Sequence, residues 1–217
     1  MNYCLSNKLR SSVNGAPWVL YGGIVTWLAM VCVGMFGLTA YANYSEPAPH
    51  VTKEWLETSS IERSRNQGQL IAFIHPRCSC SRATVRQLMQ LTSQATGSFD
   101  VSFQFFCPSS QPRSWVKTPL WEMASTLPNA QCEIDWDGTE AQLHGVNTSG
   151  HVLFFDEQGT CQFNGGVTIS RGHDGESVAL KTLSLIVNQR HTSFVEYPVF
   201  GCALFTSVDT LRGGKSQ

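Results

Sequence analysis

The sequence predicts an α/β fold in which a mixed sheet is flanked by helices and preceded by one N-terminal transmembrane helix. Three observations support this prediction. The stretch 11–44 has no charged side chain. Beyond it, short apolar runs typical of buried strands alternate with segments of helical periodicity. A β-hairpin pattern then precedes the last helical segment. Parallel strands joined by helices and followed by a hairpin give a mixed sheet.

The N-terminal apolar segment is long enough to cross a membrane. Residues 18–41 form a run of 24 residues, and about 20 suffice for a helix that spans a bilayer. Lys8 and Arg10 precede the run, whereas acidic residues predominate just after it. The positive-inside rule then predicts a cytoplasmic tail at 1–16, an anchor in membrane lipid at 17–42 and a C-terminal domain across the membrane.

A cleaved signal peptide is the alternative interpretation of the same segment. Ala40, Tyr41 and Ala42 have the small-residue form of a cleavage site, and the preceding positive charges suit a signal peptide. The apolar run is longer than the ~7–15 residues typical of signal peptides, which favours an uncleaved anchor. Both interpretations deliver the rest of the chain to the same side of the membrane.

The remaining chain divides into a proline-containing linker at 43–51, a compact domain at 52–205 and a disordered tail at 206–217. Within the domain, apolar periodicity and bounding Gly or Pro residues predict the elements. Predicted helices cover 53–65, 81–93, 115–127 and 177–190, and predicted strands cover 69–75, 99–106, 132–136, 151–156 and 160–163. The last two strands form a hairpin with a Gly-containing turn.

The charge balance excludes one large class of partners. Fifteen basic and sixteen acidic residues give a formal net charge of -1, so no basic field gathers phosphates and no nucleic-acid partner is expected. Charged residues make up 14% of the chain, below the ~25% of soluble domains, as a membrane segment would produce. Of the eight cysteines, six lie in the predicted domain, and the sequence leaves their pairing open.

Cys78 and Cys80 stand between the first buried strand and the helix that follows it, and they are the best candidates for reactive groups. Unpaired backbone N–H groups and the helix dipole lower a thiol pKa at such a position. Arg77 and Arg82 add positive charge, and His75 adds it when protonated. The resulting thiolate is a nucleophile or a metal ligand. The alternative is a pair of inert core cysteines, which rarely lie one residue apart between two arginines.

Four segments carry a resemblance to a known family. They are HPRCSCSRATVRQL (75–88), TSGHVLFFDEQG (148–159), GGVTISRGHDG (165–175) and PVFGC (198–202). Together with the element order, they resemble the thioredoxin-like superfamily and, within it, the bacterial membrane-tethered proteins called RedB. The resemblance implies a thioredoxin-like domain at 52–205 in a single-pass protein of the bacterial cytoplasmic membrane, with that domain periplasmic or otherwise extracytoplasmic. It also implies a thiol–disulfide oxidoreductase that acts through Cys78 and Cys80.

Two features depart from the family pattern. One residue instead of two separates the cysteines, and Ser81 stands where the second cysteine is expected. A disulfide in the shortened ring is expected to be strained and easily reduced. Thr148, Ser149 and Gly150 replace the cis-proline that the family places beside its active site. Ser149 and Gly150 are therefore predicted to line the site and to alter recognition of the substrate backbone.

Three further residues are candidates for the same site. Cys107 ends the strand expected beside the first one, and Cys202 lies in an apolar segment after the last predicted helix. Either of them would supply a third thiol, and Cys202 is a candidate resolving thiol or third metal ligand. His173, in a Gly-rich loop, is a candidate base or ligand. The alternatives are a core position for Cys107 and an exposed loop position for His173. Cys132 and Cys161 are interpreted as disulfide or core residues.

Three hypotheses about function are compatible with these residues. The first is thiol–disulfide exchange with envelope protein thiols or disulfides, without a cofactor, in which Cys78 attacks and Cys80 resolves. The second is copper binding, since thiolates suit Cu(I), by Cys78, Cys80, Cys202 and a histidine, either His173 or His75. The third is a scaffold that only binds a partner. The sequence leaves the substrate, the electron donor, the direction of exchange and the oligomeric state open.

Overall fold

The computed structural model describes residues 16–45, 51, 53–64, 66–189 and 193–205. The chain separates after Asn43 into an N-terminal unit, of which helix α1 is the described part, and a C-terminal unit that holds a sheet. The predicted tail at 206–217, nearly all of the tail at 1–16 and most of the linker at 43–51 lie outside the described residues.

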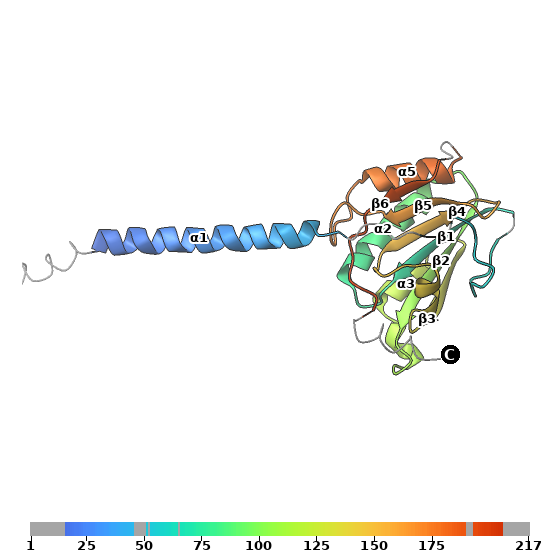
Figure 1. Ribbon diagram of the computed structural model, residues 1–217, viewed down its shortest axis with the longest axis horizontal. Coiled ribbons are helices and arrows are strands. Elements are labelled where there is room, and N and C mark those ends of the chain that lie inside the picture. The colour runs from blue at the N-terminus through green and yellow to red at the C-terminus, as the bar shows by residue number, and fades with distance from the viewer. Residues whose placement is uncertain (1–15, 46–50, 52, 65, 190–192, 206–217) are drawn as a thin grey trace, which may run out of the picture. The chain divides into compact units, whose positions relative to one another are not determined.

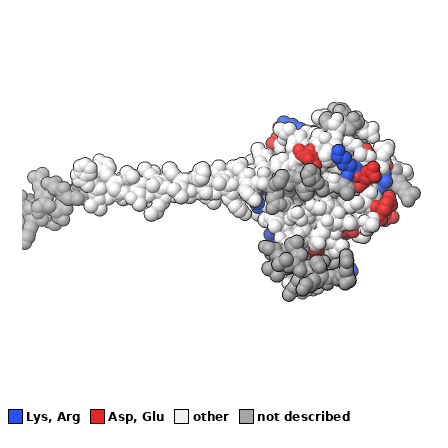
Figure 2. All heavy atoms as spheres, viewed as in Figure 1, with Lys and Arg blue, Asp and Glu red and all other residues white. Residues whose placement is uncertain are grey.

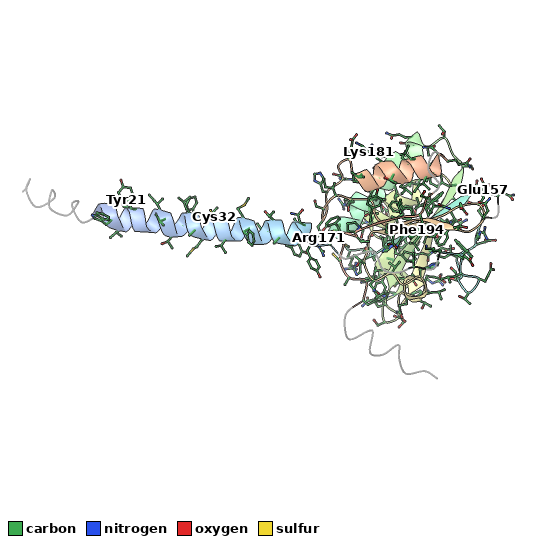
Figure 3. All side chains as sticks on the ribbon, turned by 45° about the horizontal axis from the view of Figure 1, so that its top comes forward. Tyr21, Cys32, Glu157, Arg171, Lys181 and Phe194 are labelled. Carbon is green, nitrogen blue, oxygen red and sulfur yellow. The ribbon has the colours of Figure 1, made fainter. Side chains whose placement is uncertain are left out.

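Helix α1 runs from Ala16 to Asn43 and carries no charged side chain (Figure 1, Figure 2). Its most apolar window has a mean hydropathy of 2.0 and is wholly exposed. Tyr21 and Cys32, for example, both project from this helix (Figure 3). A helix that is apolar on every face is stable where lipid or protein surrounds it. By length and composition, α1 is able to cross a membrane.

Six strands form one mixed sheet in the order β3-β2-β1-β4-β5-β6 (Figure 1). Strands β1, β2 and β3 are parallel neighbours, β4 is antiparallel to both β1 and β5, and β6 is parallel to β5. A first strand between a parallel and an antiparallel neighbour is the arrangement of thioredoxin-like folds, and the predicted mixed sheet is confirmed. The strands are β1 Gly68–Ile74, β2 Phe99–Cys107, β3 Ala130–Trp136, β4 His151–Phe155, β5 Cys161–Gly166 and β6 Val195–Tyr197.

Helices cover one face of this sheet, and a smaller layer covers the other. The main core lies under α2 (Ser79–Gln94), α3 (Pro119–Ser125) and α5 (Val178–Val187). A second cluster on the opposite face combines β1 and β4 side chains with α4 (Thr139–Leu143) and with apolar residues from both ends of the domain. Every residue of β1 is buried, so the strand that leads to Cys78 is fixed from both sides. Each buried Leu, Ile or Phe contributes about 1.5–3 kcal/mol.

The predicted helix at 53–65 is absent from the described part of that segment. Glu54 instead forms an antiparallel bridge with Thr160, and the Trp55 N–H donates to the Gly159 carbonyl (2.8 Å). Ser59 donates to Glu140 (2.8 Å) and also accepts from the Ile61 N–H. Serine side chains that bond locally compete with helical hydrogen bonds. The apolar pattern of this segment thus predicted buried side chains correctly, but the helix predicted from it was wrong.

The predicted helix at 115–127 is two shorter elements. A 3-10 turn, η1 (Arg113–Val116), precedes α3, and the break lies at Thr118, whose φ and ψ of -101° and 167° are extended. A residue before proline is disfavoured in the helical region, and Pro119 then starts α3. The sequence reasoning also missed α4 and β6, which are five and three residues long.

Candidate functional site

Cys78 is the N-cap residue of α2. Strand β1 ends at Ile74, a tight turn follows in which the Cys78 N–H donates to the His75 carbonyl (3.1 Å), and α2 begins at Ser79. The φ and ψ of Cys78 are -89° and 123°, which is extended and typical of an N-cap. The first backbone N–H groups of a helix have no intrahelical partner, and the dipole favours negative charge there. The fold therefore holds the Cys78 sulfur where a thiolate is stabilised.

Three cysteines converge at this helix end. The Sγ atoms of Cys78, Cys80 and Cys202 all lie within 4.8 Å of one another, and a hydrogen bond of 2.9 Å joins the sulfurs of Cys78 and Cys202. Cys78 and Cys80 are each 6% exposed, and Cys202 is half-buried. All three are free thiols. We call these residues the cysteine triad.

The three thiols differ in acidity. Burial alone would raise the pKa of Cys78, but the Cys202 thiol and the backbone and hydroxyl of Ser81 stabilise its thiolate and bring the pKa below its ordinary value of 9.0. Burial and the adjacent Cys78 charge raise the pKa of Cys80, and burial with hydrogen bonding to Cys78 raises that of Cys202 to about 12. Of the three thiols, Cys78 is therefore the one most readily converted to a thiolate, which is the reactive form of a cysteine.

Ser149 connects the loop before β4 to the triad. Its hydroxyl accepts the His75 N–H (2.6 Å) and lies 2.5 Å from the Ser81 hydroxyl. Ser149 and Ser81 are both fully buried. Gly150 has a φ of +89°, and its N–H donates to the Phe73 carbonyl of β1 (2.7 Å). The described residues contain no cis peptide bond. A trans Ser-Gly pair thus stands where the family pattern has a cis-proline.

The basic neighbours lie on the outer side of the triad. His75 stacks on Phe106 (5.8 Å between ring centres), and burial together with the Arg77 charge lowers its pKa. His75 is therefore neutral at neutral pH and adds no charge. Arg77 and Arg82 are exposed, and the Arg77 guanidinium lies 4.9 Å from the centre of the Trp115 ring.

A groove of about 340 Å³ opens beside Cys78. Of the triad, only Cys78 is among the described residues that line it, and no acidic side chain is among them. The groove thus combines an apolar wall, two arginines and the most acidic thiol of the triad. Its lining residues are Pro76, Arg77, Cys78, Ser79, Arg82, Thr118, Pro119 and Leu120.

Cys107 and His173 lie outside the triad. Cys107 is fully buried at the end of β2, its thiol donates to the Pro108 carbonyl (3.6 Å), and burial raises its pKa. His173 lies in an exposed loop, and its backbone N–H donates to the Ser170 carbonyl (3.3 Å). Neither belongs to the group of donor atoms within 4.8 Å of one another. Cys132 and Cys161 are free thiols as well and do not pair with each other.

Two functional residues escaped the sequence reasoning. Ser81 was noted only as a missing cysteine, yet it stabilises the Cys78 thiolate. Arg171, in the same loop as His173, was not among the predicted site residues, yet its positive charge lowers the pKa values of Cys80 and Cys202. Its guanidinium also donates to the Tyr44 carbonyl (3.3 Å). The basic residue in an otherwise Gly-rich loop (Figure 3) was the available signal.

Comparisons with known proteins support the fold. No protein-family model matches the chain, and no curated protein matches its sequence. A hypothetical protein from Sinorhizobium meliloti 1021 has a TM-score of 0.55 at 14% identity, covering 74% of this chain and 98% of that protein. An uncharacterised conserved protein from Geobacillus kaustophilus has a TM-score of 0.50 at 14% identity, covering 76% and 92%.

A thiol:disulfide interchange protein from Bacteroides sp. is also similar, with a TM-score of 0.41 at 17% identity over 68% of this chain and 92% of that one. At 14% identity, the likenesses to the Sinorhizobium and Geobacillus proteins concern the fold alone.

Proposed function

We propose that this chain is a membrane-anchored thiol–disulfide exchange protein in which Cys78 is the attacking thiol. The observation that carries the proposal is the convergence of two further thiols on a helix-capping cysteine of lowered pKa. A single reactive cysteine forms a mixed disulfide and stops there. A second thiol within reach releases the product and completes a two-electron exchange.

The substrate class is a protein thiol or disulfide of the cell envelope. The Cys78 groove has two arginines and no acidic residue among its described lining. A peptide segment whose cysteine lies next to Asp or Glu complements this charge, and apolar neighbours of that cysteine suit Pro119 and Leu120. No cofactor is needed for the exchange.

The location follows from α1 and the flanking charges. An apolar helix that is able to cross a membrane precedes the domain, and Lys8 and Arg10 lie on its N-terminal side. The positive-inside rule then puts the domain outside the cytoplasmic membrane, as in the RedB proteins that the sequence resembles. An oxidising compartment of this kind is where disulfide exchange partners are found.

Trapping of a mixed disulfide tests the proposal. The double variant Cys80→Ser/Cys202→Ser in the full chain keeps the nucleophile and lacks both other triad thiols. With a peptide disulfide and with envelope extracts, it should accumulate mixed disulfides at Cys78, identified by peptide mass spectrometry. Cys132→Ser, a half-buried cysteine outside the triad, is the matched control and should accumulate none. A double variant that forms no mixed disulfide with either substrate would refute the proposal and favour the scaffold hypothesis.

Cu(I) binding is a second candidate, favoured by the triad itself. Three soft sulfur donors within 4.8 Å of one another suit Cu(I), and the lowered pKa of Cys78 eases the deprotonation that metal binding requires. His173 does not belong to this donor group. The reduced full chain should take one Cu(I) from a chromophoric chelator, and Cys78→Ser should abolish this uptake while Cys132→Ser does not. Equal uptake by wild type and Cys78→Ser would exclude this candidate.

A further inference from the structure

The segment after β6 lies against the loop that precedes β4. Ala203 forms an antiparallel bridge with Thr148. The Ser149 N–H donates to the Cys202 carbonyl, and the Leu204 N–H donates to the Asn147 carbonyl, both at 2.8 Å. We call residues 198–205 the C-terminal strap. It is bound through its backbone, as an added strand is bound, and it therefore holds Cys202 in a defined position.

Gly201 fits the strap closely to this loop. A Cβ atom at this position would lie 1.8 Å from the Ser149 carbonyl oxygen, which is closer than any non-bonded contact allows. Only glycine lets the two backbones approach so closely. On the other side of Cys202, the Leu204 side chain is buried in the second core cluster. The strap is thus fixed on both sides of the cysteine that it carries.

We infer that Cys202 is the resolving thiol of this protein and that its oxidised form holds a Cys78–Cys202 disulfide. This inference rests on the proposed exchange function and decides one assignment in it, since the sequence pattern gave the resolving role first to Cys80 and offered Cys202 as an alternative. The 2.9 Å separation of the two sulfurs leaves a displacement of about 1 Å to reach the ~2.05 Å of a disulfide.

The short spacing disfavours Cys80 in this role. Cys80 is the second residue of α2, two positions after the N-cap Cys78. Its sulfur also lies within 4.8 Å of the Cys78 sulfur, but a disulfide between residues only two positions apart closes a short ring, which is expected to be strained and easily reduced. A Cys78–Cys202 bond closes no such ring, and its two sulfurs are already 2.9 Å apart.

The strap also separates the substrate from the resolving thiol. Its backbone occupies the Ser149 N–H and the Asn147 carbonyl, so a substrate segment cannot pair with those groups while the strap is bound. Of the triad, only Cys78 is among the described lining residues of the groove. The substrate disulfide therefore reaches Cys78 from the groove, and Cys202 reaches it from the strap.

The two steps balance as follows. The Cys78 thiolate attacks the substrate disulfide, a Cys78–substrate bond forms, the substrate S–S bond breaks, and the first substrate sulfur leaves as a thiolate. The Cys202 sulfur, having given its proton to that departing thiolate, then attacks the Cys78 sulfur. A Cys78–Cys202 bond forms, the mixed disulfide breaks, and the second substrate sulfur leaves and takes a proton from water. The substrate gains two electrons, and a dithiol reductant of the envelope returns the protein to its reduced form.

The pKa of Cys202 should fall during this cycle, at the step in which Cys202 attacks. Burial, the hydrogen bond to Cys78 and the Cys78 charge raise its pKa, whereas the Arg171 charge lowers it. When Cys78 enters a mixed disulfide, its negative charge disappears and Arg171 remains. Cys202 therefore becomes a better nucleophile at the step in which it acts.

Disulfide mapping on the full chain tests the inference without any substrate protein. Wild type, Cys80→Ser, Cys202→Ser, Gly201→Ala and Ala203→Ser are oxidised with glutathione disulfide, alkylated and digested without reduction. We expect a Cys78–Cys202 peptide in wild type and in Cys80→Ser. Gly201→Ala should form about tenfold less of this peptide, because its strap cannot lie against Ser149. Ala203→Ser, a change at an exposed strap position, should form as much of it as wild type. In Cys202→Ser, the mixed disulfide of Cys78 with glutathione should accumulate.

Two outcomes separate the inference from the function on which it rests. In the first outcome, the main product in wild type is a Cys78–Cys80 peptide, and glutathione is retained on Cys78 in Cys80→Ser but not in Cys202→Ser. This outcome would overturn the inference and leave the exchange function standing. A Cys78 that neither accepts glutathione nor forms any disulfide in any variant would overturn both. Iodoacetamide labelling of Cys78 under denaturing conditions controls for prior oxidation, and a far-UV spectrum of each variant controls for folding.

Discussion

The sulfur atoms of Cys78 and Cys202 lie 2.9 Å apart although 124 residues separate the two positions in the chain. One of them caps α2, and the other is carried by the C-terminal strap. With Cys78 ionised, the Cys202 thiol is the donor in this hydrogen bond, which lowers the pKa of Cys78 and raises that of Cys202. In the proposed exchange, this difference in acidity makes Cys78 the sulfur that attacks first and Cys202 the sulfur that attacks second.

Removing the donor should make Cys78 less acidic. In Cys202→Ala the burial of Cys78 stays and the hydrogen bond is lost, so the pKa of Cys78 should rise. At neutral pH less thiolate is then present, and alkylation of Cys78 by iodoacetamide should slow down. The rate, followed by peptide mass spectrometry from pH 6 to pH 10, gives the midpoint. Cys202→Ser, whose hydroxyl is also able to donate, should restore part of the acidity. Identical profiles for wild type and Cys202→Ala would show that the hydrogen bond does not act on Cys78.

Ser149 should be important for stability. Its hydroxyl accepts the His75 N–H and contacts the Ser81 hydroxyl in a fully buried position. Ser149→Ala leaves those groups without this partner, which costs about 1–3 kcal/mol of unfolding free energy. Urea unfolding of the full chain in detergent measures the loss. Ser93→Ala, on the exposed side of α2, should stay within about 0.5 kcal/mol of wild type. A loss of that size in both variants would contradict the role given to Ser149.

The position of Cys78 could be predicted from sequence because it depends on local signals. A buried strand, a Pro-Arg turn and an amphipathic helix follow each other within about thirty residues, and each has its own pattern. The end of β1 and the start of α2 then place the first cysteine without knowledge of the rest of the chain. The succession of strands and helices along the chain, and hence the mixed sheet, followed from the same local patterns with the rule that parallel strands need a connecting helix.

The approach of Cys202 could not be predicted in this way. It depends on β6, three residues long, and on a strap that is bound by backbone hydrogen bonds and a close Gly201 contact. Neither leaves a periodic pattern. The pairing of Ser81 with Ser149 has the same origin, since two serines 68 positions apart carry no signal of contact. The sequence thus offered Cys202 and Ser149 as candidates, but their contacts came from tertiary structure, whereas the position of Cys78 came from local sequence.

Substrate charge should affect the rate of exchange at Cys78. Arg77 and Arg82 border the groove, and no acidic residue is among its described lining. A peptide disulfide with Asp on both sides of its cysteine should react faster than one with Lys at those positions. Exposed charge pairs contribute about 0.2–1 kcal/mol each, so Arg82→Gln should reduce the preference by up to about fivefold. Stopped-flow measurement of the first exchange step gives both rates. The preference should shrink at high salt, and a preference unchanged by salt and by Arg82→Gln would argue against a charged groove.

Acid should destabilise the domain through His151. This side chain is fully buried in β4, its Nε2 lies 2.6 Å from the Asn164 Oδ1, and burial lowers its pKa to about 4. A lowered histidine pKa means that the folded state prefers the neutral ring. The neutral His151 ring therefore makes its full contribution to stability above pH 6.5, and this contribution is lost as the pH falls from 6.5 toward 4. The lost unfolding free energy is about 3 kcal/mol, from 1.36 kcal/mol for each pKa unit.

A measurement of acid sensitivity must separate the titration of His151 from that of Asp135. Burial raises the pKa of Asp135 to about 6, so its contribution has the opposite sign: it is complete at low pH and is lost as the pH rises from 3.8 to 6. We therefore compare unfolding free energies of wild type and His151→Gln at pH 4.5 and pH 7.5. The variant should lack the His151 part of the acid sensitivity, and the difference between the two proteins should shrink at pH 4.5. An equal difference at both pH values would assign the acid sensitivity to other groups.

Charged residues in the middle of α1 should release the protein from the membrane. Arginine at a helix centre costs about 2.5–3.5 kcal/mol on insertion, so Met30→Arg with Val33→Arg should move the protein from the carbonate-resistant membrane fraction to the soluble fraction. Met30→Leu with Val33→Leu keeps the helix apolar and is the control. In wild type, the intact mass should include residues 1–42, because an uncleaved anchor keeps them. A mature chain that begins after Ala42 would identify the segment as a signal peptide, in which case the domain acts free of the membrane and the triad meets its partners in solution.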